Sequence, residues 1–366
     1  MFWLFSAFFF FNFSIVGVYV VFLPKILKEI GYEAFEIGVV FSAAPLIRFF
    51  MPFFFLKHFS LNKRVVSLAL LTLFLSVLSF YITIDNFYLF LISILLYSLS
   101  SSVILPYIES FSVDFLKKDG YGKARLFGSL GFMIASLALA KFLKSYIDGL
   151  NFFLFFTLMT IFFSILILII YKDRDFKKRA KRERGFSFGK DLGLWINIFL
   201  MQVSFGAFYN FFTIYENSHG VGIDDVSYLW SFSIICEMAV FYFQSIFLKA
   251  NLRFLISIST LITSFRWLII YLFPSNLMFL YFEQSLHAVS FALYHSAVLN
   301  YLYKIYENKK LSFQFYYGFG FGLGGFIGSI LSGYLYGKNL FLYASLIAFL
   351  GYLSMSRVVL KVRDWI

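Results

Sequence analysis

Charged residues are scarce in this chain. Only 14% of its 366 residues are Asp, Glu, Lys or Arg, while 61% are hydrophobic. Soluble domains contain roughly 25% charged and roughly 45 to 50% apolar residues. No soluble core needs so much apolar surface, whereas each membrane-spanning helix needs about 20 predominantly apolar residues. The composition therefore excludes an ordinary soluble protein and predicts many transmembrane helices rather than several domains.

Residues and motifs that support catalysis are also scarce. The single Cys236 lies within an apolar run, so the chain can form neither an internal disulfide nor a cysteine-based metal site. His287 and His295 are eight residues apart, beyond the spacing of three or four that places two ligands side by side on a helix. No glycine-rich phosphate loop followed by Lys and Ser or Thr occurs, which leaves ATP-driven work unsupported. We therefore expect no enzyme, no metal site and no cofactor.

Apolar runs separated by polar stretches predict twelve membrane spans. Their approximate limits are 3–24, 35–56, 64–83, 87–110, 124–146, 151–171, 192–215, 226–248, 253–273, 276–303, 312–336 and 339–357. A strongly charged stretch divides them into two groups of six. We predict an all-α membrane protein with six-helix bundles at 1–171 and 192–366, joined by a cytoplasmic linker at 172–191.

Positive charge is distributed unevenly between the two sides of the predicted membrane. With the amino terminus in the cytoplasm, most of the 31 Lys and Arg residues lie on the cytoplasmic side. Short loops rich in Lys and Arg orient membrane proteins in this way. The net charge of +12 is therefore explained without a nucleic-acid partner. We expect a monomer in the cytoplasmic (inner) membrane of a bacterium, with both termini in the cytoplasm and a small solute as its partner.

A few ionisable residues lie inside the predicted spans. Each needs a partner, a cavity or a function, because insertion at mid-bilayer costs roughly 2.5 to 3.5 kcal/mol. Counted from the outer ends of their spans, Arg266 and Glu283 lie at the same depth and can pair across neighbouring helices. Glu283 and His287 are four residues apart and share a helix face. We expect this cluster to link protonation to solute binding, with a purely structural salt bridge as the alternative.

The run YGKARLFGSLGF at 121–132 resembles the start of span 5 in the lactose permease and phenylpropionate permease branch of the major facilitator superfamily. By this resemblance, Arg125 takes the place of the arginine that binds the solute in lactose permease. Glu109 takes the place of the glutamate on span 4 that acts with that arginine. The resemblance implies the major facilitator fold of two six-helix bundles and transport by alternating access.

The second half continues this resemblance. Glu237 in SIICEMAVF, Arg266 in SFRW and His287 in QSLHAVSF resemble the span 8 glutamate, span 9 arginine and span 10 histidine of the same branch. The largest departure is Ser290, at the place where lactose permease has a glutamate that carries the proton. If the chain is proton-coupled, we expect Glu237 or the Glu283 and His287 pair to carry the proton.

These features together predict a secondary active transporter for a small organic solute, driven by the proton gradient. The expected solute is an aromatic acid, whose carboxylate an arginine could hold, or a sugar or nucleoside. The residues expected to bind it are Arg48, Glu109, Arg125 and Ser129, and those expected to couple protons are Glu237, Arg266, Glu283 and His287. Two alternatives are an uncoupled facilitator or exporter, and a receptor that binds a solute without transporting it.

Overall fold

The computed structural model describes residues 1–57, 62–170, 188–307 and 309–362, and these residues are almost entirely helical. The α-helices are α1 (Phe2–Gly17), α2 (Leu23–Ile30), α3 (Ala34–Lys57), α4 (Lys63–Thr83), α5 (Phe87–Phe142), α6 (Tyr146–Ile170), α7 (Leu192–Ser218), α8 (Ile223–Phe247), α9 (Leu252–Leu272), α10 (Leu277–Ser285), α11 (Tyr294–Ile305), α12 (Lys309–Phe315), α13 (Gly325–Tyr334) and α14 (Leu340–Val362). Three π-helical segments interrupt them, η1 (Val18–Phe22), η3 (Ala288–Leu293) and η4 (Tyr316–Gly324).

These elements make the twelve predicted spans. The first span is α1, η1 and α2, the tenth is α10, η3 and α11, and the eleventh is α12, η4 and α13. The long α5 supplies spans four and five, because the chain folds back within it. Arg125 forms an ion pair with Glu109, whereas sixteen residues of straight helix would separate them by about 24 Å. Nine stretches of the described residues are individually long and apolar enough to cross a membrane.

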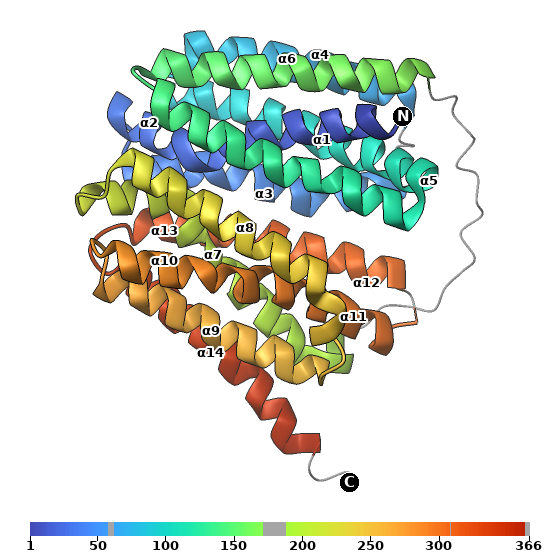
Figure 1. Cartoon of the computed structure of the whole chain (residues 1–366), viewed down its shortest axis with the longest axis vertical. Coiled ribbons are helices and arrows are strands. Elements are labelled where there is room, and N and C mark those ends of the chain that lie inside the picture. Colours follow the sequence, from blue (N-terminus) through green and yellow to red (C-terminus); the bar gives the residue numbers. More distant parts are fainter. Residues whose placement is uncertain (58–61, 171–187, 308, 363–366) are drawn as a thin grey trace.

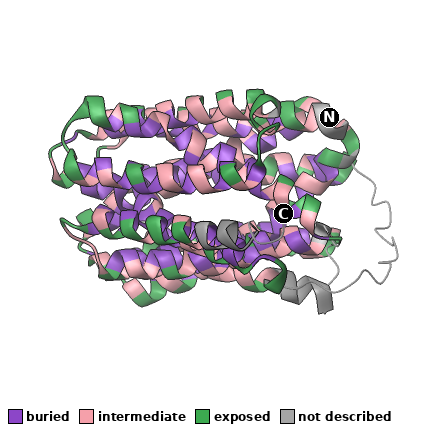
Figure 2. Cartoon of the chain, turned by 90° about the horizontal axis from the view of Figure 1, so that it is seen from below, coloured by how far each residue is buried: buried purple, intermediate pink, exposed green. Residues whose placement is uncertain are grey.

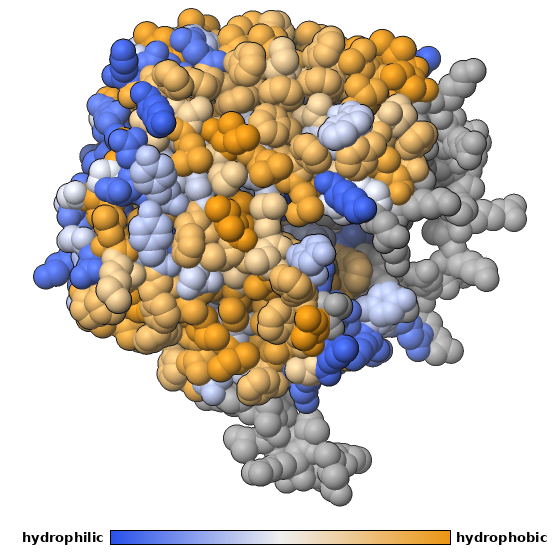
Figure 3. All heavy atoms as spheres, in the orientation of Figure 1, coloured by the Kyte–Doolittle hydropathy of each residue, from blue (hydrophilic) through white to orange (hydrophobic). Residues whose placement is uncertain are grey.

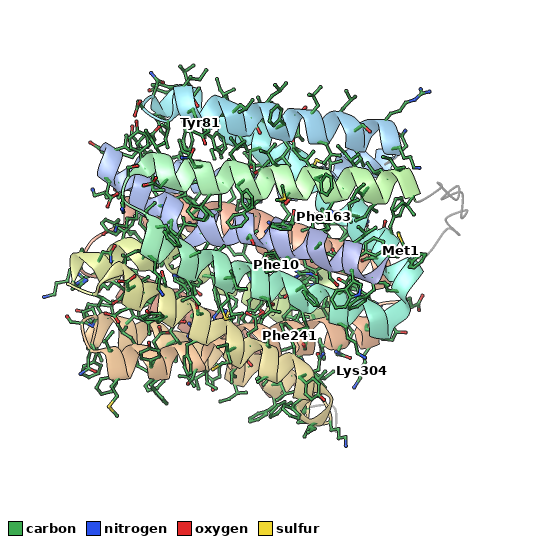
Figure 4. All side chains as sticks on the ribbon, turned by 45° about the horizontal axis from the view of Figure 1, so that its top comes forward. Met1, Phe10, Tyr81, Phe163, Phe241 and Lys304 are labelled. Carbon is green, nitrogen blue, oxygen red and sulfur yellow. The ribbon has the colours of Figure 1, made fainter. Side chains whose placement is uncertain are left out.

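The spans form two six-helix bundles, α1 to α6 and α7 to α14, which lie one above the other in Figure 1. Within the first bundle, α1 packs on α5 and α6, and within the second, α7 packs on α13 and α14. Met1 and Lys304 lie at one end of the molecule and Tyr81 at the other (Figure 4). We refer to these as the Met1 end and the Tyr81 end.

The outer surface is that of a membrane protein. Many large apolar side chains along the spans are exposed, with Ile82 82% exposed and Ile169 71% exposed. Figure 2 shows buried residues along the inner sides of the helices, and Figure 3 shows a broad hydrophobic surface with hydrophilic residues gathered toward the ends. Apolar patches of this size are rare on soluble proteins but are solvated by lipid. The predicted fold class is therefore confirmed.

Glycine brings helices into contact at matching places in the two bundles. A Cβ on Gly131 of α5 would overlap the backbone of Phe10 in α1. In the second bundle, a Cβ on Gly206 of α7 would overlap the backbone of Gly328 in α13. Small residues permit such close approach between helices in membranes. The pairs α1 with α5 and α7 with α13 therefore pack in the same way.

Most of the predicted linker at 172–191 lies outside the described residues. Its last residues form a short 3₁₀ helix, η2 (Phe188–Asp191), that leads into α7. The Asp191 side chain accepts a hydrogen bond from the backbone N–H of Leu194 and forms an ion pair with Arg253 at 2.9 Å. The side chain therefore caps α7 and attaches it to α9. The bundle limits at 171 and 192 remain predictions.

Candidate functional site

An ion pair on α5 forms the first part of the site. The Nε atom of Arg125 lies 3.5 Å from Oε1 of Glu109, and the Tyr121 hydroxyl donates to the same oxygen. Both charged side chains are about one-third exposed, at 34% and 32%. An ion pair with this exposure contributes little to stability. Its charges are therefore available to a ligand, and we call Glu109 and Arg125 the exposed pair.

Aromatic rings hold the Arg125 guanidinium in place. Its central carbon lies 3.8 Å from the centre of the Phe13 ring and 5.7 Å from that of Phe9. Gly128 makes this possible, since a Cβ there would lie 2.9 Å from Nη1 of Arg125 and 2.8 Å from the Phe13 ring. A guanidinium over aromatic faces is favoured by cation–π attraction. Ser129 lies one turn further along α5 and is half-buried.

Arg48 in α3 is a cation inside a predicted span. Its side chain is exposed, and it forms no ion pair with any carboxylate that the structure describes. It interacts electrostatically with the hydroxyls of Tyr19, Tyr209 and Tyr317. An exposed cation at this depth must face water or a ligand. Three tyrosines thus lie within electrostatic range of a cation that has no described anionic partner, a combination suited to a ring with an acidic group.

The second bundle contains a buried network around Arg266 of α9. Nη2 of Arg266 lies 3.0 Å from Oε2 of Glu283, and Nε donates to the backbone oxygen of Glu283 at 2.9 Å. Nη1 donates to the Ser290 hydroxyl at 2.7 Å and lies 3.1 Å from Nδ1 of His287. Arg266, Glu283 and Ser290 are 0% exposed. The pairing of Arg266 with Glu283 expected from their depth is therefore present.

The hydrogen bonds assign a tautomer to His287. Arginine can only donate, so Nδ1 of His287 must accept from Arg266, and the ring proton must lie on Nε2. Nε2 lies 3.5 Å from Oε2 of Glu237 in α8. Glu237 therefore adjoins the network through His287, not through Arg266. We call Glu237, Arg266, Glu283, His287 and Ser290 the buried network.

Tyrosine side chains interact with charged residues of both bundles. Tyr209 of α7 interacts electrostatically with Arg48 of the first bundle and with Glu237 and Arg266 of the second. Arg125 interacts in the same way with Glu237 across the interface between the bundles. Charged groups from both bundles thus converge on one region of the interface.

Tyr317 extends this region within span eleven. It interacts electrostatically with Glu109, Arg125 and Arg48 of the first bundle. Its hydroxyl lies 3.5 Å from Nε2 of His295, and the side chain is 42% exposed. Tyr317 therefore places a half-accessible phenol from the second bundle beside the cations of the first.

The interface between the bundles is closed at the Tyr81 end. A Cβ on Gly38 of α3 would lie 2.6 Å from the backbone oxygen of Ser329 in α13, and one on Gly333 would lie 2.7 Å from that of Ala34. Toward the Met1 end, Arg48 keeps solvent access, and Figure 3 shows a hollow between the two bundles on that side. The charged region is therefore reached from the Met1 end in this conformation.

The structure brings the predicted residues into two groups and adds others. Arg125 meets Glu109, Glu283 and His287 contact Arg266, and Glu237 contacts His287, while their roles in binding and coupling remain predictions. Among the residues that the structure describes, no three His, Cys, Asp or Glu side chains are grouped so as to hold a metal ion. Residues absent from the predicted site are Tyr19, Tyr209, Tyr317 and the buried Glu216 of α7.

Comparison with known proteins agrees with this architecture. The model of the MFS_1 like family matches residues 2–345. The chain is 26% identical over 367 residues to the probable 3-phenylpropionic acid transporter of Escherichia coli (strain K12), covering 94% of each chain. Among solved structures, the nucleoside transporter NupG aligns with a TM-score of 0.79 at 14% identity, over 97% of this chain and 98% of that one. The POT family transporter PepTSo aligns with a TM-score of 0.72 at 12% identity, over 99% and 97%.

Proposed function

The chain belongs to the MFS_1 like family, and from this membership we propose that it couples the movement of a small aromatic acid to that of a proton. It is a multi-pass membrane protein that transports small solutes, and it is not an enzyme. The proposal concerns which solute moves, what drives it and in which direction. Each of these points depends on a different part of the site.

The lack of an ion-pair partner for Arg48 among the described residues is the observation that supports an acidic solute. A cation exposed inside a membrane span is unfavourable unless water or an anion solvates it. A carboxylate would pair with the guanidinium through charge-assisted hydrogen bonds. Tyr19, Tyr209 and Tyr317 beside it would pack on an aromatic ring and still offer hydroxyls. The relative from Escherichia coli is described as a transporter of 3-phenylpropionic acid, which carries both groups.

Glu237 supplies a physical reason for proton coupling. Its carboxylate is 18% exposed and lies near Tyr209, which also neighbours Arg48. An anionic solute held by Arg48 would be repelled by an ionised Glu237, so protonation of Glu237 favours solute binding. By linkage, the bound solute favours protonation to the same extent. The proton and the solute anion then bind together and their charges cancel. The loaded transporter therefore moves no net charge across the membrane.

Orientation and driving direction follow from the charge distribution. We propose that the Met1 end faces the cytoplasm of a bacterium, since most of the described Lys and Arg residues outside the spans lie at that end. The conformation described is then open to the cytoplasm and closed to the outside. Alternating access requires the reverse state, in which α3 and α13 separate at Gly38 and Gly333. The transporter is proposed to work as a monomer.

An uncoupled facilitator is the second candidate, and Ser290 favours it. Its neutral hydroxyl accepts from Arg266 at 2.7 Å, where a carboxylate could have exchanged a proton. If no other group of the buried network titrates during transport, the solute moves only down its own gradient. Accumulation against a gradient separates the two candidates.

Uptake of labelled 3-phenylpropionate into proteoliposomes tests the proposal. A pH gradient with an alkaline interior should drive accumulation above that in protein-free vesicles, which set the baseline because the neutral acid crosses bilayers unaided. The Glu237→Gln variant should retain exchange of solute at equal pH but lose the part driven by the gradient. Equal uptake with and without the gradient would establish the facilitator instead. Saturable binding without any flux would establish a receptor.

A further inference from the structure

Glu216 is a buried carboxyl group that the mechanism above does not use. It lies in the last turn of α7 near the Tyr81 end, and its side chain is 0% exposed. Neither carboxylate oxygen has a hydrogen-bond partner among the residues that the structure describes. An ionised carboxylate buried without a partner is strongly unfavourable. This side chain is therefore compatible with its surroundings when it carries a proton or when a cation reaches it.

The position of Glu216 on α7 directs it toward the buried network. Phe208, Phe212 and Glu216 follow one another at intervals of four residues, so they lie on one side of the helix. The Phe208 ring lies 5.6 Å from that of His287, centre to centre. Glu216 continues this side by one further turn and interacts electrostatically with Glu283 of α10. It therefore faces the interior of the second bundle instead of the lipid.

The charges around Glu216 do not balance if every carboxyl is ionised. Of the described groups, Glu283 of α10 and Tyr215 of α7 itself interact with Glu216 electrostatically. Arg266 of α9 is already engaged by Glu283 at 3.0 Å. Glu216 therefore interacts with a second buried carboxyl and with no described cation, and like charges at such a site favour retention of a proton.

Unpartnered polar atoms beside the two carboxyls give a second, independent indication of a ligand. Oε1 of Glu283 has no hydrogen-bond partner within the described part of the chain, and neither amide atom of the adjacent, completely buried Gln284 has one. Buried polar atoms are nearly always paired in folded proteins. A mobile proton, with the water that conducts it, would pair these atoms.

We propose that Glu216 is a proton-carrying site that connects the Tyr81 side to the buried network. When the bundles open at that end, Glu216 takes up a proton. While this end is still open to water, the proton passes from its carboxyl oxygen to Oε1 of Glu283, and the negative charge left on Glu216 is solvated until the next proton binds. Protonation of Glu283 weakens its ion pair with Arg266. Because Arg266 also contacts His287, and His287 contacts Glu237, the change is transmitted to Glu237. This inference rests on the proposed proton coupling and assigns the entry point of the proton.

The Glu216→Gln variant tests the assignment, because it keeps the side-chain volume and resembles the protonated form. In proteoliposomes, exchange of labelled 3-phenylpropionate at equal pH should remain close to wild type, which also shows that the variant is folded. Uptake driven by a pH gradient should fall to the level of protein-free vesicles. Asp224→Asn is the matched control. It removes an exposed carboxyl of the same bundle at the same end and should leave both activities unchanged.

A label on the wild-type protein gives a test that needs no variant. Dicyclohexylcarbodiimide reacts with protonated carboxyls in apolar surroundings, so mass spectrometry should find Glu216 modified at neutral pH and the exposed Glu109 unmodified. Gradient-driven uptake by Glu216→Gln equal to wild type overturns the assignment alone. Labelling of Glu109 but not Glu216 does the same. A wild type that ignores the pH gradient overturns the proposed coupling, and with it the assignment.

Discussion

Two arginines in corresponding halves of the molecule have opposite surroundings. Arg125 pairs with Glu109 at 3.5 Å, is one-third exposed and lies against aromatic rings. Arg266 is completely buried and donates to Glu283, His287 and Ser290. The first arginine is available to a ligand, whereas the second makes all of its described contacts within its own bundle. The two bundles have similar helix packing and divide the charged chemistry between them.

Removing Arg266 should have the largest effect on stability. Arg266→Met leaves Glu283 buried without its cation, and breaking a buried pair on one side costs about 3 to 5 kcal/mol. We expect a strongly lowered unfolding midpoint in detergent, together with loss of transport. The double variant Arg266→Met with Glu283→Leu removes both charges and should recover most of the stability without recovering transport. A single variant as stable as wild type would show that the network does not hold α9 to α10.

Glycine contacts should have the next largest effect, and a similar one in both bundles. Gly131→Ala and Gly206→Ala each press a Cβ against the backbone of a neighbouring helix, and overpacking of this kind costs about 1 to 3 kcal/mol. Gly122→Ala is the control, because nothing lies within 4 Å of a Cβ there. Thermal unfolding of the three variants measures this. If the unfolding temperatures of Gly131→Ala and Gly206→Ala differed strongly, the two helix pairs would not be packed equally tightly.

Hydrophobicity and charge predicted the fold because the bilayer imposes them. Membrane insertion requires the twelve apolar runs and the uneven distribution of Lys and Arg between the two sides. Both can therefore be recognised without knowledge of tertiary packing. The depth count also predicted the pairing of Arg266 with Glu283, since helices in a bundle are nearly parallel and residues at one depth can meet. Span length was predicted less well. Ending span seven at 215 placed Glu216 in a loop, although the four-residue spacing from Phe208 through Phe212 continues to it.

The tyrosines of the site could not have been predicted from spacing alone. Tyr317 lies in η4, where a π-helix changes the number of residues per turn and so changes which side chains face the interface. Among 25 Tyr and 56 Phe residues, no pattern separates those that line the site from those that face lipid. The convergence of Arg48, Tyr209 and Tyr317 comes from the packing of the two bundles against each other.

Arg125 should matter far more for the solute than for the fold. Since its ion pair is partly solvated, Arg125→Met should change the free energy of unfolding by about 0 to 1 kcal/mol. The same change should abolish the stabilisation by added 3-phenylpropionate that a thermal-shift experiment records for wild type. Arg125→Lys keeps the charge but loses the planar group over Phe13. Its stabilisation by 3-phenylpropionate should therefore fall between that of wild type and that of Arg125→Met. A loss of stability as large as that of Arg266→Met would contradict the division between the bundles.

Arg48 should have the smallest effect on stability and the most selective effect on binding. It has no described anionic partner, so Arg48→Gln leaves no carboxylate unpaired and removes a charge from within a span. The hydrogen bonds lost to a solute carboxylate are worth about 1.5 to 3 kcal/mol, or roughly 10- to 100-fold in affinity. Binding of 3-phenylpropionamide, which has the same ring and no charge, should change little. An equal loss for acid and amide would mean that Arg48 shapes the site without contacting the acidic group, and the solute's charge would then have to be met by the exposed pair.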